Sequence, residues 1–227
     1  MPSMRSRDER VWQAATLALV GGFLDAYAYL AHGGVFANAQ TGNVVLFGVD
    51  AALGRWPAAL RHLPPLLAFL VGLGTVEALA RLRGRRGFNH PVRLVLVVEA
   101  VTCTLVGLLP AATPSVLATI LIAWAATLQI GTFRTVRSAA YNTTFTTGNI
   151  RSLVSDSAAW FVERDMAARL RAIALAAVVG SFAVGAVLGG LATRWGHTHA
   201  VLFVVPVLVG LLFAIIRETR RIRQQSG

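Results

Sequence analysis

The stretch TGNVVLFGVDAA at residues 41–52 returns 106 positions later as TGNIRSLVSDSA at residues 147–158. The two stretches share the pattern T-G-N-x6-D-x-A without a gap. A pattern that returns once per half of a chain is typical of an internal repeat. We therefore predict a single domain, residues 1–227, built from two repeats of about 11–110 and about 115–217.

The composition is typical of an integral membrane protein. Of the 227 residues, 56% are hydrophobic and 14% are charged, against roughly 25% charged in a soluble domain, and the mean hydropathy is +0.63. A helix needs about 20 apolar residues to cross a bilayer. Continuous apolar stretches, rather than alternating ones, predict an all-α polytopic bundle of six transmembrane helices. They lie at 11–31, 62–81, 92–110, 115–136, 169–191 and 199–217.

Three crossings per repeat would invert the second repeat relative to the first, as in many secondary transporters. All 21 residues of the Lys and Arg class are arginines. If the N-terminus lies in the cytoplasm, only Arg55, Arg61 and Arg194 fall on the outer side, and such an excess of arginine on the cytoplasmic side is typical of membrane proteins. A full crossing by 34–54 would move the Arg-rich loop 81–93 outside. We therefore predict a 3+3 inverted repeat with two re-entrant or interfacial half-helices, and with both termini in the cytoplasm.

Each T-G-N motif is predicted to begin one of the half-helices. Thr41 or Asn43 is suited to cap free backbone N–H groups, and Gly42 permits close approach of backbone or ligand. A helix over 43–54 would be about 18 Å long, a little over half of the hydrocarbon core. Its positive end would face the membrane interior and favour an anion or a carboxylate. An ordinary capped junction between loop and helix is the alternative.

Two carboxylates fall inside predicted spans, where a charge is costly and usually functional. Asp25 lies in the first span, with Tyr29 one turn later on the same face. Its alternative role is that of a carboxylate at the outer interface, paired with His32. Glu99 lies about two turns inside the third span and has no partner nearby in sequence. Asp25 and Glu99 are therefore our candidate proton carriers.

Other polar and small residues have structural interpretations. Glu77 precedes Arg81 by four residues, a favourable spacing for a helical ion pair. Asp50 and Asp156 either line a polar path or, as we favour, pair at an interface with nearby arginines, namely Arg55, Arg151 and Arg164. Small residues at four-residue spacing in the fifth span permit close helix packing, inside the chain or in a homodimer. They are Ala177, Ser181, Gly185 and Gly189.

The same motifs resemble the signatures of the YoaK-like family, small bacterial membrane proteins that carry a domain of unknown function. The first signature is GGFLDAYAYL at 21–30 followed by GGVFANAQTGN at 33–43. The second is LQIGTFR at 128–134 with TTGN at 146–149. The resemblance covers essentially the whole chain and implies a location in the bacterial inner membrane. It implies no substrate, and Ile130 stands where the family typically has Asn.

The leading functional hypothesis is a small secondary transporter or permease for a small anion or polar metabolite. The solute would be bound by polar residues and glycines of both halves. These are Asp25, Tyr29, Asn38, Gln40, Thr41, Gly42, Asn43, Gln129, Arg134, Asn142, Thr147, Gly148 and Asn149.

Two other classes stay open. One is a non-transporting membrane partner, such as an assembly factor or a sensor, which docks through the loop 81–93 and the basic tail. The other is a channel. No catalytic motif is present, so we expect no enzyme, no cofactor and no metal. The net charge of +11 fits orientation and anionic lipid rather than nucleic acid. The expected partners are the lipid bilayer and an unknown small solute, and a homodimer is left open.

Overall fold

The computed structural model describes residues 10–86, 91–110, 112–133, 135–136, 139–140 and 146–225. These residues are almost entirely helical, as predicted. The long helices are α1 (Val11–Ala31), α4 (Leu63–Arg86), α5 (Pro91–Gly107), α6 (Ser115–Thr132), α8 (Met166–Gly196) and α9 (Val204–Gln225). The shorter elements are α2 (Gln40–Ala52), α3 (Trp56–Leu60), α7 (Thr146–Glu163), the 3-10 helix η1 (His197–Phe203) and the antiparallel strands β1 (Thr135–Val136) and β2 (Ala139–Ala140).

Four helical stretches of the described chain are long and apolar enough to cross a membrane. They are Val11–Ala31, Trp56–Arg81, Ser115–Thr132 and Met166–Arg221. The last is 56 residues long and contains α8, η1 and most of α9, so it includes two of the six predicted spans. The predicted span 92–110 forms α5, which has 17 residues.

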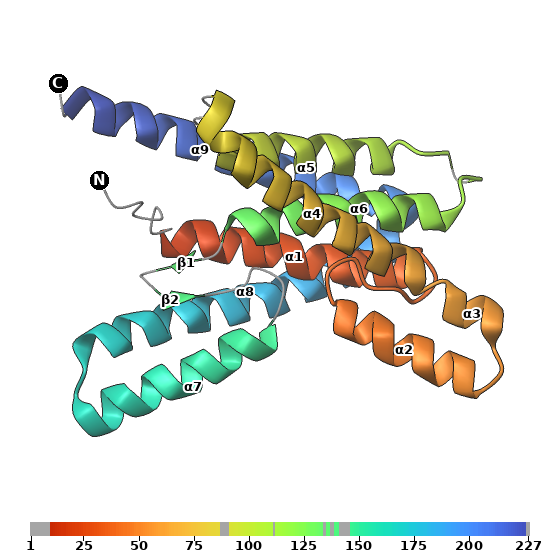
Figure 1. Cartoon of the computed structure of the whole chain (residues 1–227), viewed down its shortest axis with the longest axis horizontal. Helices are drawn as coiled ribbons and strands as arrows, with labels where there is room; N and C mark the ends of the chain where they lie inside the picture. The colour runs from red at the N-terminus through yellow and green to blue at the C-terminus, as the bar shows by residue number, and fades with distance from the viewer. Residues whose placement is uncertain are drawn as a thin grey trace.

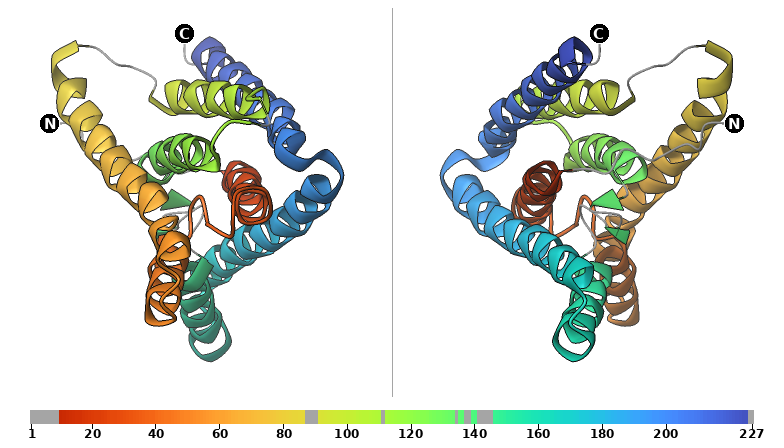
Figure 2. Two further views of the ribbon diagram at one scale, coloured as in Figure 1. Left: turned by 90° about the vertical axis from the view of Figure 1, so that its right-hand side faces the viewer. Right: turned by 90° about the vertical axis from the view of Figure 1, so that its left-hand side faces the viewer.

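The helices are arranged around a central pair (Figure 2). Seen along the long axis of Figure 1, α1 and α6 lie in the middle, with α8 and α4 on opposite flanks. Helices α5 and α9 pack together on one side, and α2 and α7 lie on the other side. The main buried cluster joins α1, α5, α6, η1 and α9 through residues such as Leu24, Leu96, Ile122, Val201 and Leu208.

Glycines bring α1 and α8 into backbone contact. A Cβ atom placed on Gly185 would lie 2.0 Å from the carbonyl oxygen of Leu19, and one on Gly189 would lie 2.5 Å from that of Phe23. Residue numbers rise together along the two helices, so they run parallel. Small residues allow such close approach between helices. The prediction that this stripe packs inside the chain is therefore confirmed for Gly185 and Gly189.

A second parallel pair, α4 with α6, is built in the same way. Gly72 lies against the side chain of Thr127, at 2.6 Å from a Cβ built on the glycine, and Gly131 lies against Val76, also at 2.6 Å. Each contact is four residues after the previous one on both helices, so these helices also run parallel.

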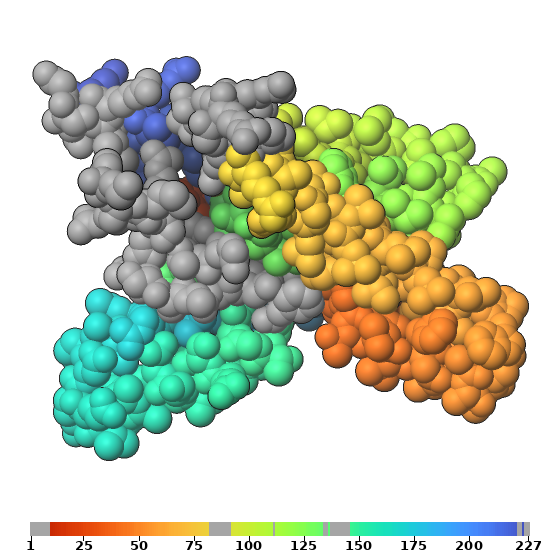
Figure 3. Space-filling model, in the orientation of Figure 1, coloured from red at the N-terminus to blue at the C-terminus, as the bar shows by residue number. Residues whose placement is uncertain are grey.

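Helices α2 and α7 begin near the middle of the molecule and run toward opposite ends (Figure 1). The space-filling view shows them in two separate lobes, one with α3 and one with the first part of α8 (Figure 3). Asp50 in α2 pairs with Arg55 at 2.7 Å, as favoured. Asp156 in α7 pairs with Arg171 of α8 at 2.8 Å, not with Arg151 or Arg164 as predicted, because the turn after α7 folds α8 back along it.

The two ends of the chain lie at the same end of the molecule (Figure 1). Arg10, directly before α1, forms an ion pair with Glu218 in α9. Gln13 in the first turn of α1 donates a hydrogen bond to the same carboxylate at 3.4 Å. The predicted ion pair between Glu77 and Arg81 is also present, with an N–O distance of 3.1 Å.

Two helix starts differ from the prediction. Helix α2 begins at Gln40, with Ala39 at the N-cap and no side-chain cap, so Thr41 and Asn43 do not cap it. The predicted span 199–217 is split, because residues 197–203 form the 3-10 helix η1 and α9 begins only at Val204. Pro206 lies in the first turn of α9, where its missing N–H needs no partner.

Candidate functional site

The candidate site is centred on Asp25, which is 5% exposed in the middle of α1. Its Oδ1 accepts hydrogen bonds from the backbone N–H groups of Asn38 at 2.7 Å and Ala39 at 3.4 Å. These two residues directly precede α2, whose free N–H groups carry partial positive charge. The positive end of α2 therefore already faces a carboxylate of the chain itself.

The loop that precedes α2 folds back along α1. The side chain of Asn38 donates from Nδ2 to the carbonyl oxygen of Gly21, at 3.1 Å. From Gly21 to the end of α1 at Ala31 is ten residues, or about 15 Å of helix. Gly33 and Gly34 both have φ of +80°, a backbone conformation that favours glycine, and they turn the chain at the end of α1.

Asn43 closes this loop onto α2. Its Oδ1 accepts from the backbone N–H of Phe36 at 2.9 Å, and its Nδ2 donates to the carbonyl oxygen of Phe36 at 2.8 Å. The same Nδ2 lies 2.9 Å from Oε1 of Gln40, and Gln40 in turn donates to the carbonyl oxygen of Ala37 at 2.9 Å. Asn43 is fully buried. The structure therefore brings together four predicted site residues: Asp25, Asn38, Gln40 and Asn43.

Three other predicted residues of this half lie outside the buried network. Tyr29 is 44% exposed and stacks on the ring of Phe36, with 5.1 Å between ring centroids. Thr41 is exposed. Gly42 leaves room for Phe36, whose ring would lie 2.9 Å from a Cβ at that position. Gly42 thus permits packing of a side chain, and Phe36 is a residue that the sequence analysis missed.

The second half is described in part. Gln129 is 1% exposed and donates to the carbonyl oxygen of Leu17 in α1, at 3.5 Å. Leu17 is eight residues before Asp25, or about 12 Å along the helix. Asn149 is buried in the first turn of α7, while Thr147 and Gly148 are exposed. Arg134 and Asn142 lie outside the described residues.

Glu99, the second candidate proton carrier, lies away from this network. It is 1% exposed in α5, one turn before the buried Cys103. Helix α5 packs against α6, η1 and α9. Figure 2 shows α5 on the opposite side of the central pair from α2 and α7. The two carboxylates therefore belong to different parts of the bundle.

A second polar cluster at the end of α1 was not predicted. Tyr27 donates from its hydroxyl to the carbonyl oxygen of Thr198 at 2.7 Å, and His32 Nε2 lies 2.9 Å from the same hydroxyl oxygen. His32 thus contacts Tyr27, and the alternative pairing with Asp25 is wrong because the Asp25 carboxylate binds backbone N–H groups. Burial lowers the pKa of His32.

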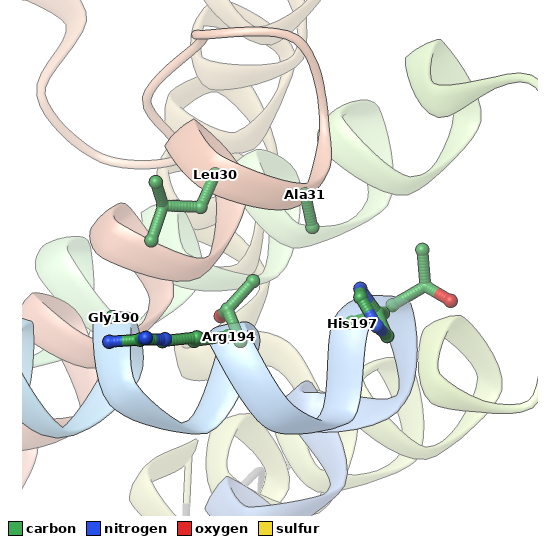
Figure 4. Close-up of a pocket in the computed structure, with 7 residues that line it drawn as sticks. Leu30, Ala31, Gly190, Arg194 and His197 are labelled. Carbon is green, nitrogen blue, oxygen red and sulfur yellow. The ribbon is translucent and has the colours of Figure 1, made fainter.

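An open hollow lies beside this cluster, between the ends of α1 and α8 (Figure 4). Its volume is about 550 Å³. It is lined by Leu30, Ala31, Gly190, Thr193, Arg194, His197 and Thr198. In Figure 4 the side chains of Arg194, in α8, and His197, at the start of η1, border it on one side, and those of Leu30 and Ala31 border it from α1.

Comparison with known proteins identifies one family. The family described as protein of unknown function (DUF1275) matches residues 13–215, which include both T-G-N motifs and every described helix at least in part. No curated protein and no solved structure matches the chain.

Proposed function

The chain belongs to the DUF1275 family of proteins of unknown function, and we propose that it is a small secondary transporter of the bacterial inner membrane. The resemblance to YoaK-like proteins is part of the same proposal. The observation that carries it is the loop 33–39, which returns along α1 to Asp25 and starts a half-helix there. Polar, non-helical backbone at such a depth is tolerated only inside protein or beside a watery cavity.

The pairing of helices supports an inverted repeat. An offset of 106 residues relates α1 to α6, α2 to α7, α4 to α8 and α5 to α9. The parallel pair α1 with α8 then corresponds to the parallel pair α6 with α4. The contacts of α5 with α9 and of α1 with α6 would lie on the axis that relates the two halves.

Six crossings account for these directions. If α1 leaves the cytoplasm, then α5 and α8 also run outward, and α4, α6 and α9 run inward. This order makes α1 parallel to α8 and α4 parallel to α6, in agreement with the glycine contacts. It also places both termini in the cytoplasm, in agreement with the ion pair between Arg10 and Glu218.

The proposed solute is a small polar metabolite or an anion. At α2 the positive helix end is taken by Asp25, and the amide groups of Gln40 and Asn43 there bind the loop and each other. An anion would instead be held at the start of α7, near Asn149. Two opposed half-helices would hold one solute between them if their starts lie close together.

A ligand screen tests this proposal. Purified full-length protein is mixed with a library of small metabolites, and the thermal midpoint is measured, because a ligand of the folded state stabilises it. Each stabilising solute is then tested for uptake into proteoliposomes. We expect at least one solute to raise the midpoint and to be taken up. No stabilising solute and no flux would reject the transporter.

Matched variants locate the site within that screen. Asn149→Ala alters the start of α7, and Thr146→Ala, in the same turn, serves as its control. We expect Asn149→Ala to remove stabilisation by the solute, with Thr146→Ala close to the native response. If the solute still stabilises both Asn149→Ala and Asn43→Ala, its binding site does not lie at the starts of the half-helices. A partner that co-purifies stoichiometrically, with no solute response, would instead support a non-transporting role.

A further inference from the structure

Two buried oxygens of the Asp25 network lack a hydrogen-bond donor. Asp25 is 5% exposed and Asn38 is 1% exposed. Within the described part of the chain, neither Oδ2 of Asp25 nor Oδ1 of Asn38 has a partner. An unsatisfied buried polar atom typically costs about 1–3 kcal/mol, so native proteins rarely keep one without a reason.

The two oxygens belong to residues that are fixed against each other. Asp25 Oδ1 accepts from the backbone N–H of Asn38 at 2.7 Å. The amide nitrogen of Asn38 donates to the carbonyl oxygen of Gly21, and this bond makes Oδ1 the free end of the amide. Each residue therefore presents one unpaired acceptor oxygen, and that of Asp25 carries negative charge when the carboxyl group is ionised. A cation or a shared proton would satisfy both oxygens.

Within the described residues, no cationic side chain hydrogen-bonds to either oxygen. Arg61 lies against Gly33 of the same loop, and the cationic side chains on the helices packed against α1 are engaged elsewhere. Helix α6 has no titratable residue. On α8, Arg171 binds Asp156, Arg169 lies over Trp160, and Arg194 borders the hollow beyond Asp25.

Two tyrosines follow Asp25 on α1 itself: the hydroxyl of Tyr27 donates to the carbonyl oxygen of Thr198, and Tyr29 stacks on Phe36. In and near η1, His197 borders the hollow, His199 contacts the carbonyl oxygen of Gly107, and His32 contacts Tyr27. On α9, Glu218 binds Arg10 at the other end of α1, and Arg217, Arg220 and Arg221 lie within three positions of Glu218 in the sequence.

We propose that Asp25 Oδ2 and Asn38 Oδ1 form a binding site for one small monovalent cation, a proton or Na⁺. A proton on Asp25 Oδ2 would donate to Asn38 Oδ1 and satisfy both oxygens at once. A sodium ion would take both oxygens as ligands. Either neutralises the buried carboxylate, which is otherwise costly at membrane depth.

The site occurs once in the chain. The offset of 106 residues places Gly131 at the position of Asp25, so the second half has no equivalent carboxylate. One cation per chain is therefore expected. This inference deepens the proposed function by giving the place and class of its coupling ion. Cation binding is measured at equilibrium and without any transported solute. A negative result for the cation site is therefore distinguishable from a negative result for transport.

Thermal unfolding of the purified full-length protein tests the site. The midpoint is measured in NaCl, KCl and choline chloride at equal ionic strength, each over a range of pH. The variants are Asp25→Asn and, as a control, Asp156→Asn, whose carboxylate pairs with Arg171. If the cation is Na⁺, each tenfold rise in its concentration above the dissociation constant should raise the native midpoint by about 3–5 °C. Asp25→Asn should not respond, and Asp156→Asn should respond as the native protein does.

If the cation is a proton, the native protein and Asp25→Asn should show the same thermal midpoint response to all three salts. The native midpoint should then fall with rising pH relative to that of Asp25→Asn. Identical responses of the native protein and Asp25→Asn to every salt and pH would overturn the proposal. Should Asp25→Asn fail to fold, Asn38→Asp adds a second carboxylate at the site. It should shift the cation response at least about tenfold toward tighter binding, and an unchanged response would overturn the proposal equally.

Discussion

At the scale of single residues, the buried amides hold the loop in place. Asn43 satisfies both the N–H and the carbonyl oxygen of Phe36, and Asn38 ties the same loop to Gly21. In a membrane interior these backbone groups have no water to bind. The amide side chains therefore determine where the loop lies and where α2 begins.

Replacing Asn43 by Leu should destabilise the protein markedly. The substitution leaves the backbone N–H and carbonyl oxygen of Phe36 unpaired in a part-buried position, and an unpaired group costs up to about 1–3 kcal/mol when it is buried. We expect a loss of about 2–4 kcal/mol in the free energy of unfolding. Thr41→Val, two residues earlier and exposed, should change it by less than about 0.5 kcal/mol. Chemical unfolding of both variants in detergent measures the difference, and equal losses would contradict the assigned role of Asn43.

His32 should make the protein less stable in acid. Burial lowers the pKa of His32 in the folded state, while the unfolded histidine titrates near about pH 6.5. The unfolded state therefore binds more protons as the pH falls below this value, so stability is present above it and is lost toward lower pH. The thermal midpoint should fall between about pH 7.5 and about pH 5.5, and it should fall less in His32→Gln. An equal fall in both proteins would assign the effect to another group.

In the first half of the chain, the important residues were predictable from the sequence, but their hydrogen-bond partners were not. Asp25 and Asn43 stood out as a carboxylate inside a span and as part of a repeated motif. Their actual contacts are backbone groups of Asn38 and Phe36, thirteen and seven residues away. Side-chain to backbone bonds across a loop leave no periodic signal. Capping by Thr41 or Asn43 was predicted instead, and pairing with His32 was the alternative role given for Asp25.

At the scale of helices, glycine spacing determines which pairs pack closely. The contacts of Gly185 and Gly189 with α1, and of Gly72 and Gly131 between α4 and α6, allow two parallel pairs with little space between backbones. The sequence predicted the stripe on α8. It did not predict the partner helix, because a small-residue stripe shows where contact occurs and not with what.

Gly185→Ala and Gly180→Ala provide a matched pair on α8. A methyl group at Gly185 would collide with the backbone of Leu19, whereas nothing lies within 4 Å of a Cβ at Gly180. Overpacking typically costs about 1–3 kcal/mol, so Gly185→Ala should lower the thermal midpoint clearly. Gly180→Ala should leave stability equal or raise it by about 0.5–1 kcal/mol through its better helix propensity. Equal midpoints for the two variants would show that α1 and α8 can move apart without a loss of stability.

Helix bounds were predictable where composition changes sharply. The stretch 11–31 coincides with α1. The start of α2 was misplaced by a few residues because Ala39, which carries no capping group, occupies the N-cap position. The 3-10 turn at 197–203 was likewise missed, because its apolar residues read as a continuation of the last span.

At the scale of the whole molecule, the account depends on two half-helices that start together and diverge. Helix α2 has 13 residues and α7 has 18, which correspond to about 20 Å and about 27 Å. Helices that run apart from a shared centre should have near starts and distant ends. Other arrangements would not place the starts of the two helices closer together than their ends. They include single crossings of the membrane by these segments and two half-helices that enter from one face.

Distances between pairs of spin labels in proteoliposomes measure this directly. Cys103, the only cysteine, is replaced by Ser, and labels are attached to the exposed positions Thr41→Cys and Thr147→Cys in one protein. A second protein carries Leu53→Cys and Val162→Cys, at the far ends of the half-helices. The account predicts a separation below about 25 Å for the starts and above about 40 Å for the ends, from the helix lengths at 1.5 Å per residue. Starts farther apart than ends would contradict the inverted arrangement and remove the main support for the transporter.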